Sequence, residues 1–255
     1  MSIQVMLFDN FIKNKINLSK DKLMTMKKKE KQKEEPKEIK FCSSLQFNQR
    51  QKMNGIDLLS KIDNETTKAV FFDPQYRGIL DKQKYGNEGI LRDKRRCNLE
   101  QMPEEMIVEF IKEIDRVLQP SAYLFLWIDK FHLCEGVSGW FSNTALQTVD
   151  LMIWEKPNIG MGYRTRNKCE FLLILQKKPI KAKSTWTIHN IPNVWKEKVI
   201  TKIHPHTKPL EMQKILINAT TNEGDIVIDP AMGSGSVLQS CLETNRTFVG
   251  CDING

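Results

Sequence analysis

The sequence lacks several features that would fix its class at once. None of its apolar runs approaches the length needed to span a bilayer, and no compact apolar segment follows a basic start, as a secretory signal requires. Six cysteines occur in 255 residues, but none forms a C-x-x-C pair, so neither a zinc site nor a disulfide framework is indicated. We expect a cytoplasmic protein with reduced thiols, no metal and no membrane association.

Acidic residues are too few to balance the basic ones, and the formal net charge is +8. Such a balance suits a polyanionic partner such as nucleic acid. Much of the excess lies in residues 21–40, a run of Lys and Glu that is typical of a solvated helix or a flexible arm. We expect residues 1–43 to be a charged appendage and residues 44–255 to be a single domain, since 40% hydrophobic residues suffice for one sizeable core.

Apolar runs and amphipathic stretches alternate along this domain. We expect strands at 44–49, 69–73, 122–129, 225–230 and 247–253, and helices at 55–62, 103–118, 209–220 and 236–244. Residues 145–156 and 169–177 could pair as an antiparallel hairpin at an edge. This order predicts an α/β fold with an open, mostly parallel sheet and helices on both faces. Ligands bind beyond the carboxyl ends of such strands, where Asp73, Asp229 and Asp252 lie.

The stretch DIVIDPAMGSGSVLQS, residues 225–240, predicts a nucleotide site. A strand ends at Asp229, and Gly233 and Gly235 allow close backbone approach before a helix opens near Ser236. The next strand ends in Asp252, which is well placed to accept hydrogen bonds from ribose hydroxyls. The third glycine of a dinucleotide fingerprint is replaced by Leu, and Walker A is missing. The expected ligand is therefore a nucleoside without a polyphosphate.

Three short motifs occur in the order DPQY (73–76), HPHTKP (204–209) and DPAMGSGS (229–236). Together they resemble the beta-class amino-methyltransferases of DNA, whose motifs are D-P-P-Y (with Asn or Ser also allowed first), H-P-x-x-K-P and F-x-G-x-G. Members transfer a methyl group from S-adenosylmethionine to N6 of adenine or N4 of cytosine. The resemblance covers roughly residues 44–252 and implies a Rossmann-like methyltransferase sheet.

The resemblance also implies which residues form the site. Asp73 and the carbonyl of Pro74 would accept hydrogen bonds from the two N–H groups of the target amine. Tyr76 would stack on a base flipped out of the duplex. The implied cofactor-binding residues are Asp229, Pro230, Ala231, Gly233, Ser234, Gly235, Ser236 and Asp252, together with His204 and Lys208 near the methionine moiety.

The sequence departs from the family pattern at two motif positions. Gln75 stands where the family usually has Pro, and Ala231 stands where it usually has Phe. The sequence also ends three residues after Asp252, where relatives often continue into another helix. These departures support an alternative reading, a cofactor-binding or DNA-binding module without catalysis. Gln75 nevertheless leaves both acceptors and Tyr76 available, so we expect activity to survive with a less rigid loop.

Several basic residues follow or precede the expected strands and would suit DNA phosphates, although ordinary basic loops look the same. They are Arg77, Arg92, Arg95, Arg96, Arg164, Arg166 and Lys168. A small target-recognition insertion is expected around residues 177–200, which include Trp186 and Trp195. No Cys follows a Pro, which argues against a cytosine-C5 enzyme.

Asp in the first catalytic position more often accompanies adenine than cytosine in this family. The expected function is therefore site-specific methylation of adenine N6 in double-stranded DNA, in restriction–modification or as an orphan enzyme, in the bacterial nucleoid. A homodimer, a partner subunit and a cognate restriction endonuclease are candidate partners. Cytosine N4, RNA and single-stranded substrates remain open alternatives.

Overall fold

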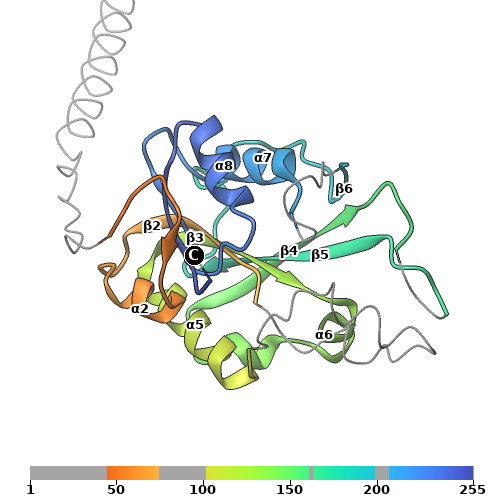
Figure 1. Cartoon of the computed structure of the whole chain (residues 1–255), viewed down its shortest axis with the longest axis horizontal. Coiled ribbons are helices and arrows are strands. Elements are labelled where there is room, and N and C mark those ends of the chain that lie inside the picture. Colours follow the sequence, from red (N-terminus) through yellow and green to blue (C-terminus); the bar gives the residue numbers. More distant parts are fainter. Residues whose placement is uncertain (1–44, 75–101, 161–163, 199–206, 255) are drawn as a thin grey trace, which may run out of the picture. The chain divides into compact units, whose positions relative to one another are not determined.

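The computed structural model describes residues 45–74, 102–160, 164–198 and 207–254. Their strands form one sheet of eight strands in the order β1-β8-β7-β2-β3-β5-β4-β6. Figure 1 labels the strands from β2 to β6. The strands are β1 (Gln51–Lys52), β2 (Thr67–Phe72), β3 (Leu118–Ile128), β4 (Leu146–Glu155), β5 (Cys169–Lys177), β6 (Val194–Lys196), β7 (Ile226–Asp229) and β8 (Thr247–Asp252). The helices are α2 (Gly55–Ser60), α5 (Glu104–Val117), α6 (Lys130–Glu135), the 3-10 helix η2 (Ser138–Phe141), α7 (Leu210–Thr220) and α8 (Ser236–Glu243).

The direction of the strands confirms the predicted mostly parallel sheet. All neighbours from β1 through β8, β7 and β2 to β3 run parallel. The β4–β5 pair is antiparallel, as is the pairing of β5 with β3, and the short β6 adds a parallel strand outside this hairpin. The central strand β2 is buried at five of its six residues, which explains its nearly continuous apolar sequence.

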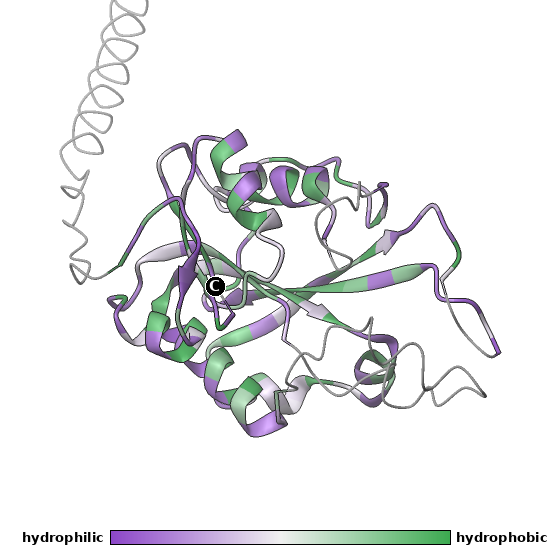
Figure 2. Cartoon of the chain, viewed as in Figure 1, coloured by the Kyte–Doolittle hydropathy of each residue, from purple (hydrophilic) through white to green (hydrophobic). Residues whose placement is uncertain are grey.

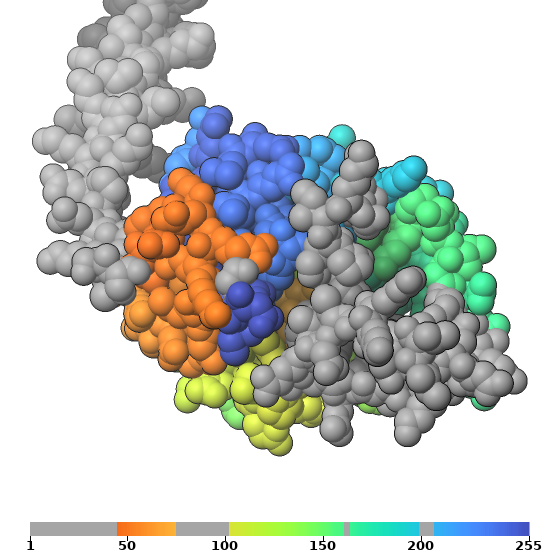
Figure 3. All heavy atoms as spheres, viewed as in Figure 1, coloured from red at the N-terminus to blue at the C-terminus, as the bar shows by residue number. Residues whose placement is uncertain are grey.

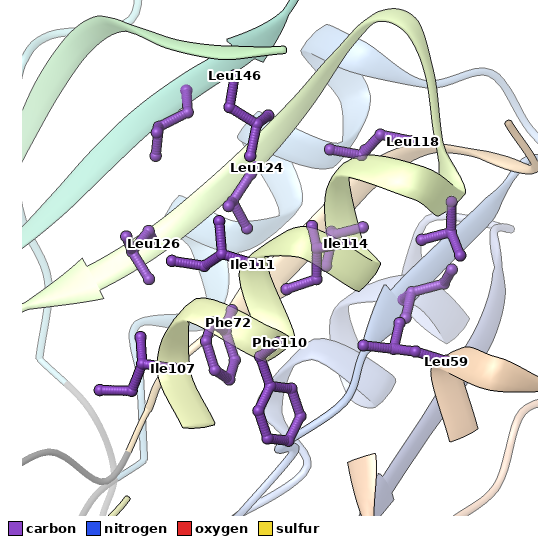
Figure 4. Packing of buried hydrophobic residues seen from close by; sticks show 14 of the residues in the cluster. Leu59, Phe72, Ile107, Phe110, Ile111, Ile114, Leu118, Leu124, Leu126 and Leu146 are labelled. Atoms are coloured by element: carbon purple, nitrogen blue, oxygen red, sulfur yellow. The ribbon is translucent and has the colours of Figure 1, made fainter. Parts of the chain in front are cut away.

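Helix α5 forms because its apolar residues recur at helical spacing. One face carries the buried residues Ile107, Phe110, Ile111 and Ile114, and exposed Glu109 lies between them in sequence. Hydrophobic and hydrophilic residues alternate along the ribbon of this helix (Figure 2). This face packs against the sheet (Figure 4), and the ring of Phe110 stacks on that of Phe72 with centroids 5.0 Å apart. The predicted helix 103–118 is thus confirmed, with Pro103 as its N-cap.

The opposite face of the sheet is covered by α7 and α8. Their buried residues join the outward side chains of the central strands in a second core layer, which includes Phe71, Phe125, Met212, Leu216, Ile217, Val237 and Cys241. The two layers confirm that helices cover both faces. No helix in the described segments is long and apolar enough to cross a bilayer.

The strand predicted at residues 44–49 is wrong within its described part. Asn48 has a left-handed φ of 58°, which interrupts an extended chain. Its side-chain oxygen accepts a hydrogen bond from Phe248 N at 2.8 Å, and its own N–H donates to Phe248 O at 2.9 Å. Pairing with β8 therefore begins only at Gln51, and these early residues lie directly against the C-terminal part of the chain (Figure 3).

Four short elements were not predicted: β1, α6, η2 and β6. Each has at most six residues, too few for a periodic pattern to show in the sequence. The charged appendage at 1–43 lies outside the described residues, so the proposed division of the chain stays a prediction.

Candidate active site

A cavity at the carboxyl edge of the sheet is lined by residues from all three motifs. Asp73 follows β2, and Asp229 ends the neighbouring strand β7, whose residue Ile228 pairs with Val70. Both carboxylates line the cavity. The other predicted site residues that line it are Lys208, Ala231, Gly233, Ser234 and Ser236. Residues separated by more than 150 positions in the chain thus face one space, because β7 is inserted beside β2.

The glycine loop has the backbone geometry that its sequence predicts. Gly233 and Gly235 both have left-handed φ angles, 47° and 81°. Gly235 is the N-cap of α8 and supplies no side-chain cap, so backbone groups dominate this helix start. The loop is held by two carboxylates: Gly233 N donates to Asp252 Oδ2 at 3.2 Å, and Ala231 N donates to Asp229 Oδ1 at 3.1 Å.

A residue outside all motifs also supports the loop. Arg50 Nη2 donates a 2.6 Å hydrogen bond to the carbonyl of Gly233, from the segment just before β1. The contact joins residues 183 positions apart, and no local pattern in the sequence signals it. Arg50 therefore connects the start of the domain to the predicted cofactor loop.

Asp229 lies in an unusual electrostatic setting. Its side chain is almost completely buried, and burial raises the pKa of its carboxyl to about 8, with Asp73 and Asp252 acting in the same direction. The hydrogen bond from the backbone of Ala231 opposes this shift. A cationic group close to such a buried acid favours its ionised form and so lowers its pKa.

Asp73 is held in an ion pair at the end of β2. Lys208 Nζ lies 2.9 Å from Asp73 Oδ2 and 2.8 Å from Glu170 Oε2. The same ammonium lies 4.6 Å from the centroid of the Trp127 ring. Lys208 was predicted to bind cofactor, and that role stays a prediction. Glu170, on β5, was not predicted at all, because it belongs to none of the motifs.

The residues present fit S-adenosylmethionine. The left-handed glycines leave room for a ligand against the loop backbone, since a Cβ added at Gly233 would meet no atom closer than 4.0 Å. Asp73 and Asp229 line this space together with Lys208, and Asp252 lies at the end of β8, next to the loop that it holds. Among the described residues, no cluster of His, Cys, Asp and Glu could hold a metal ion.

The remaining predicted site residues lie apart from the cavity or outside the described segments. Pro74, Pro230 and Gly235 belong to the same strand ends and loop without lining the cavity. The predicted site residues outside the described segments are Tyr76, His204, Arg77, Arg92, Arg95 and Arg96. Gln75 also lies outside them.

The predicted DNA-facing residues that are described lie in the turn between β4 and β5. Arg164 and Arg166 are exposed, and exposed Lys168 forms a 2.6 Å ion pair with Glu155. In the segment proposed for target recognition, Trp186 and Trp195 are half-buried and pack against the second core layer. These two tryptophans therefore anchor the segment to the domain.

Comparison with known proteins shows the family of this chain. Residues 67–255 match the model of the family described as DNA methylase (N6_N4_Mtase). The Type II methyltransferase M.HhaII of Haemophilus parahaemolyticus is 58% identical over 207 residues, which cover 81% of this chain and 91% of that protein. M.HpaI of Haemophilus parainfluenzae is 25% identical over 229 residues, covering 79% of this chain and 68% of that protein.

Solved structures share the fold. The crystal structure of the M1.HpyAVI–SAM complex superposes with a TM-score of 0.58 at 20% identity, covering 80% of this chain and 92% of that one. The PvuII DNA methyltransferase, described as cytosine-N4-specific, gives 0.58 at 14% identity and covers 79% of this chain and 80% of that one. With the family match over most of its length, the chain belongs to the S-adenosylmethionine-dependent DNA amino-methyltransferases.

Proposed function

We propose that this protein methylates N6 of adenine at a specific site in double-stranded DNA, as the modification half of a restriction–modification system. The observation that carries the proposal is the shared cavity, in which Asp73 faces the glycine loop. The Type II methyltransferase M.HhaII, 58% identical over nearly its whole length, supports the biological setting. A cognate restriction endonuclease is then the expected partner, and a second copy of the chain is a further candidate.

The chemistry explains why an acid is needed at this strand end. An exocyclic amine is a weak nucleophile because its lone pair is delocalised into the base. Asp73 and the carbonyl of Pro74 would accept hydrogen bonds from its two N–H groups. These hydrogen bonds would hold the lone pair out of conjugation. S-adenosylmethionine, when bound, supplies the methyl group. Asp73, at the carboxyl end of β2, would keep the amine oriented and accept the hydrogen bond that strengthens as positive charge develops on nitrogen.

The choice of adenine rests on the residue at position 73. Asp in this position more often accompanies adenine than cytosine in the family that the motifs resemble. N4 of cytosine is the alternative target, because the same two acceptors would serve its amine equally well. Arg164 and Arg166, exposed in the β4–β5 turn, would contact phosphates and carry no base information.

The test is methyl transfer from labelled S-adenosylmethionine to unmethylated double-stranded DNA, followed by analysis of the nucleosides. N6-methyladenine is the expected product. N4-methylcytosine would keep the mechanism and overturn the proposed base. Cofactor binding without transfer to DNA would overturn the proposed activity, and parallel reactions with single-stranded DNA and RNA would then show whether another nucleic acid is the substrate.

A further inference from the structure

Four side chains of alternating charge form a chain that leads away from the proposed catalytic acid. Asp73 contacts Lys208, Lys208 contacts Glu170, and Glu170 contacts Lys156. Two carboxylates and two ammonium groups balance one another, so the cluster has no net formal charge. The cluster joins the end of β2, the residues before α7 and the hairpin of β4 and β5.

Lys208 is the fixed centre of this cluster. Its side chain is only 15% exposed, and its ammonium lies over the ring of Trp127. Burial lowers the pKa of Lys208, but Asp73 and Glu170 more than compensate, and the net pKa lies above its ordinary value. Lys208 therefore remains charged at any pH at which the enzyme would work.

Glu170 contacts that ammonium as a carboxylate. Burial raises the pKa of Glu170, whereas Lys208 and Lys156 lower it, and the net pKa is about 2. An ionised carboxylate thus binds Lys208 Nζ, which also contacts Asp73 and the Trp127 ring. Without it, the flexible lysine could adopt other contacts with Asp73.

We propose that Glu170 is a positioning residue, which acts through Lys208 to fix the orientation of the Asp73 carboxylate. The proposal rests on the proposed catalytic role of Asp73. It assigns a function to a residue of β5 that lies outside every motif and does not line the cavity. The Lys156 ammonium, packed over Trp154, would hold Glu170 in turn.

The expected effect is on turnover and not on cofactor binding. A misplacement of about 1 Å at a reacting centre can cost on the order of 100-fold in rate. Glu170→Gln keeps the size of the side chain but removes its charge, so we expect kcat to fall about 10- to 100-fold. The dissociation constant for S-adenosylmethionine, measured by calorimetry, should change less than about twofold. Glu170→Asp, which keeps the charge, should retain more turnover than Glu170→Gln.

The matched control is Glu155→Gln. Glu155 lies on the adjacent strand of the same hairpin and also pairs with two lysines, Lys168 and Lys196, neither of which contacts Asp73. Its side chain is 26% exposed, compared with 32% for Glu170. At saturating DNA, Glu155→Gln should leave kcat unchanged, and thermal unfolding should show that all variants are folded.

Two results would overturn the positioning role: unchanged kcat in folded Glu170→Gln, or a loss of turnover that follows a loss of cofactor affinity. Asp73→Ala, assayed in parallel, separates this failure from failure of the proposed function. If Asp73→Ala is inactive while Glu170→Gln is normal, only the role of Glu170 is wrong. If Asp73→Ala retains normal turnover, the catalytic role of Asp73 is wrong, and the positioning role is wrong with it.

Discussion

At the scale of single residues, Asp73 gains its proposed role from its place immediately after a buried strand. Phe72 is fully buried and belongs to the core, whereas the Asp73 side chain is 31% exposed and faces the cavity. The rigid strand fixes the backbone of the acid, and Lys208 fixes its carboxylate. A functional group next to a rigid strand is held more precisely than one far along a loop.

Asp73→Ala should abolish methyl transfer and leave the binding of S-adenosylmethionine nearly intact, because the glycine loop is not changed. Single-turnover transfer of a labelled methyl group and calorimetric titration measure the two properties separately. Asp57→Ala, which removes an exposed carboxylate from α2, is the control and should behave like the wild type. Normal turnover in Asp73→Ala would contradict the assignment.

Asp229 should make the stability of the cofactor-free protein depend on pH. Its carboxyl titrates at about 8 in the folded state, against an ordinary value of 3.8. Between these values the folded state holds the extra proton, so the free energy of unfolding falls as pH rises, by at most about 1.4 kcal/mol per pH unit from this group. The contribution is complete below the ordinary pKa and is lost as pH passes the folded pKa.

Asp229→Asn removes this titration. The unfolding free energy of the variant should therefore fall less steeply than that of the wild type between the ordinary and the folded pKa of Asp229. Urea unfolding of both proteins, without cofactor and at several pH values, gives the two slopes. Equal slopes would show that Asp229 titrates normally in the folded protein.

At the scale of elements, the sequence predicts those features whose cause is local. The buried face of α5 recurs every three or four residues, and the strand β2 is a run of apolar residues, so both are visible in a short window. The turn at Asn48 depends instead on hydrogen bonds with Phe248, 200 residues away. Arg50 and Glu170 likewise gain their contacts only from the order of strands in the sheet, which no single window contains.

Gly233→Val should abolish cofactor binding and cost about 1–2 kcal/mol of stability through its left-handed backbone. A side chain would occupy the space that the loop leaves for the ligand. Gly224→Val is the matched control, since Gly224 also has a left-handed φ, 79°, with open space around it, but lies before β7 and away from the cavity. The control should lose similar stability and keep its affinity for S-adenosylmethionine. Equal affinity in both variants would remove the glycine loop from the site.

At the scale of the whole molecule, the formal net charge of +8 should favour binding to DNA of any sequence, strongly dependent on salt. The logarithm of the DNA-binding constant falls linearly with the logarithm of the salt concentration. If Arg164 contacts one phosphate, Arg164→Ala should make this slope less steep by about 0.9. Lys112→Ala removes the same charge from the exposed side of α5 and should leave the slope unchanged. Binding of a labelled duplex at several salt concentrations measures both slopes, and identical slopes would place Arg164 away from DNA.

The insertion of β7 and β8 between β1 and β2 has a consequence for how a cell makes this protein. Some 150 residues separate Phe72 from Ile226, and ribosomes add roughly 5–20 residues per second, so roughly 8–30 s pass between synthesis of β2 and of β7. During this interval the edge of β2 that later pairs with β7 is unpaired. An unpaired edge of an apolar strand favours association with other chains. Because Asp73 and the glycine loop come together only where β7 pairs with β2, the candidate site can form only after β7 has been made.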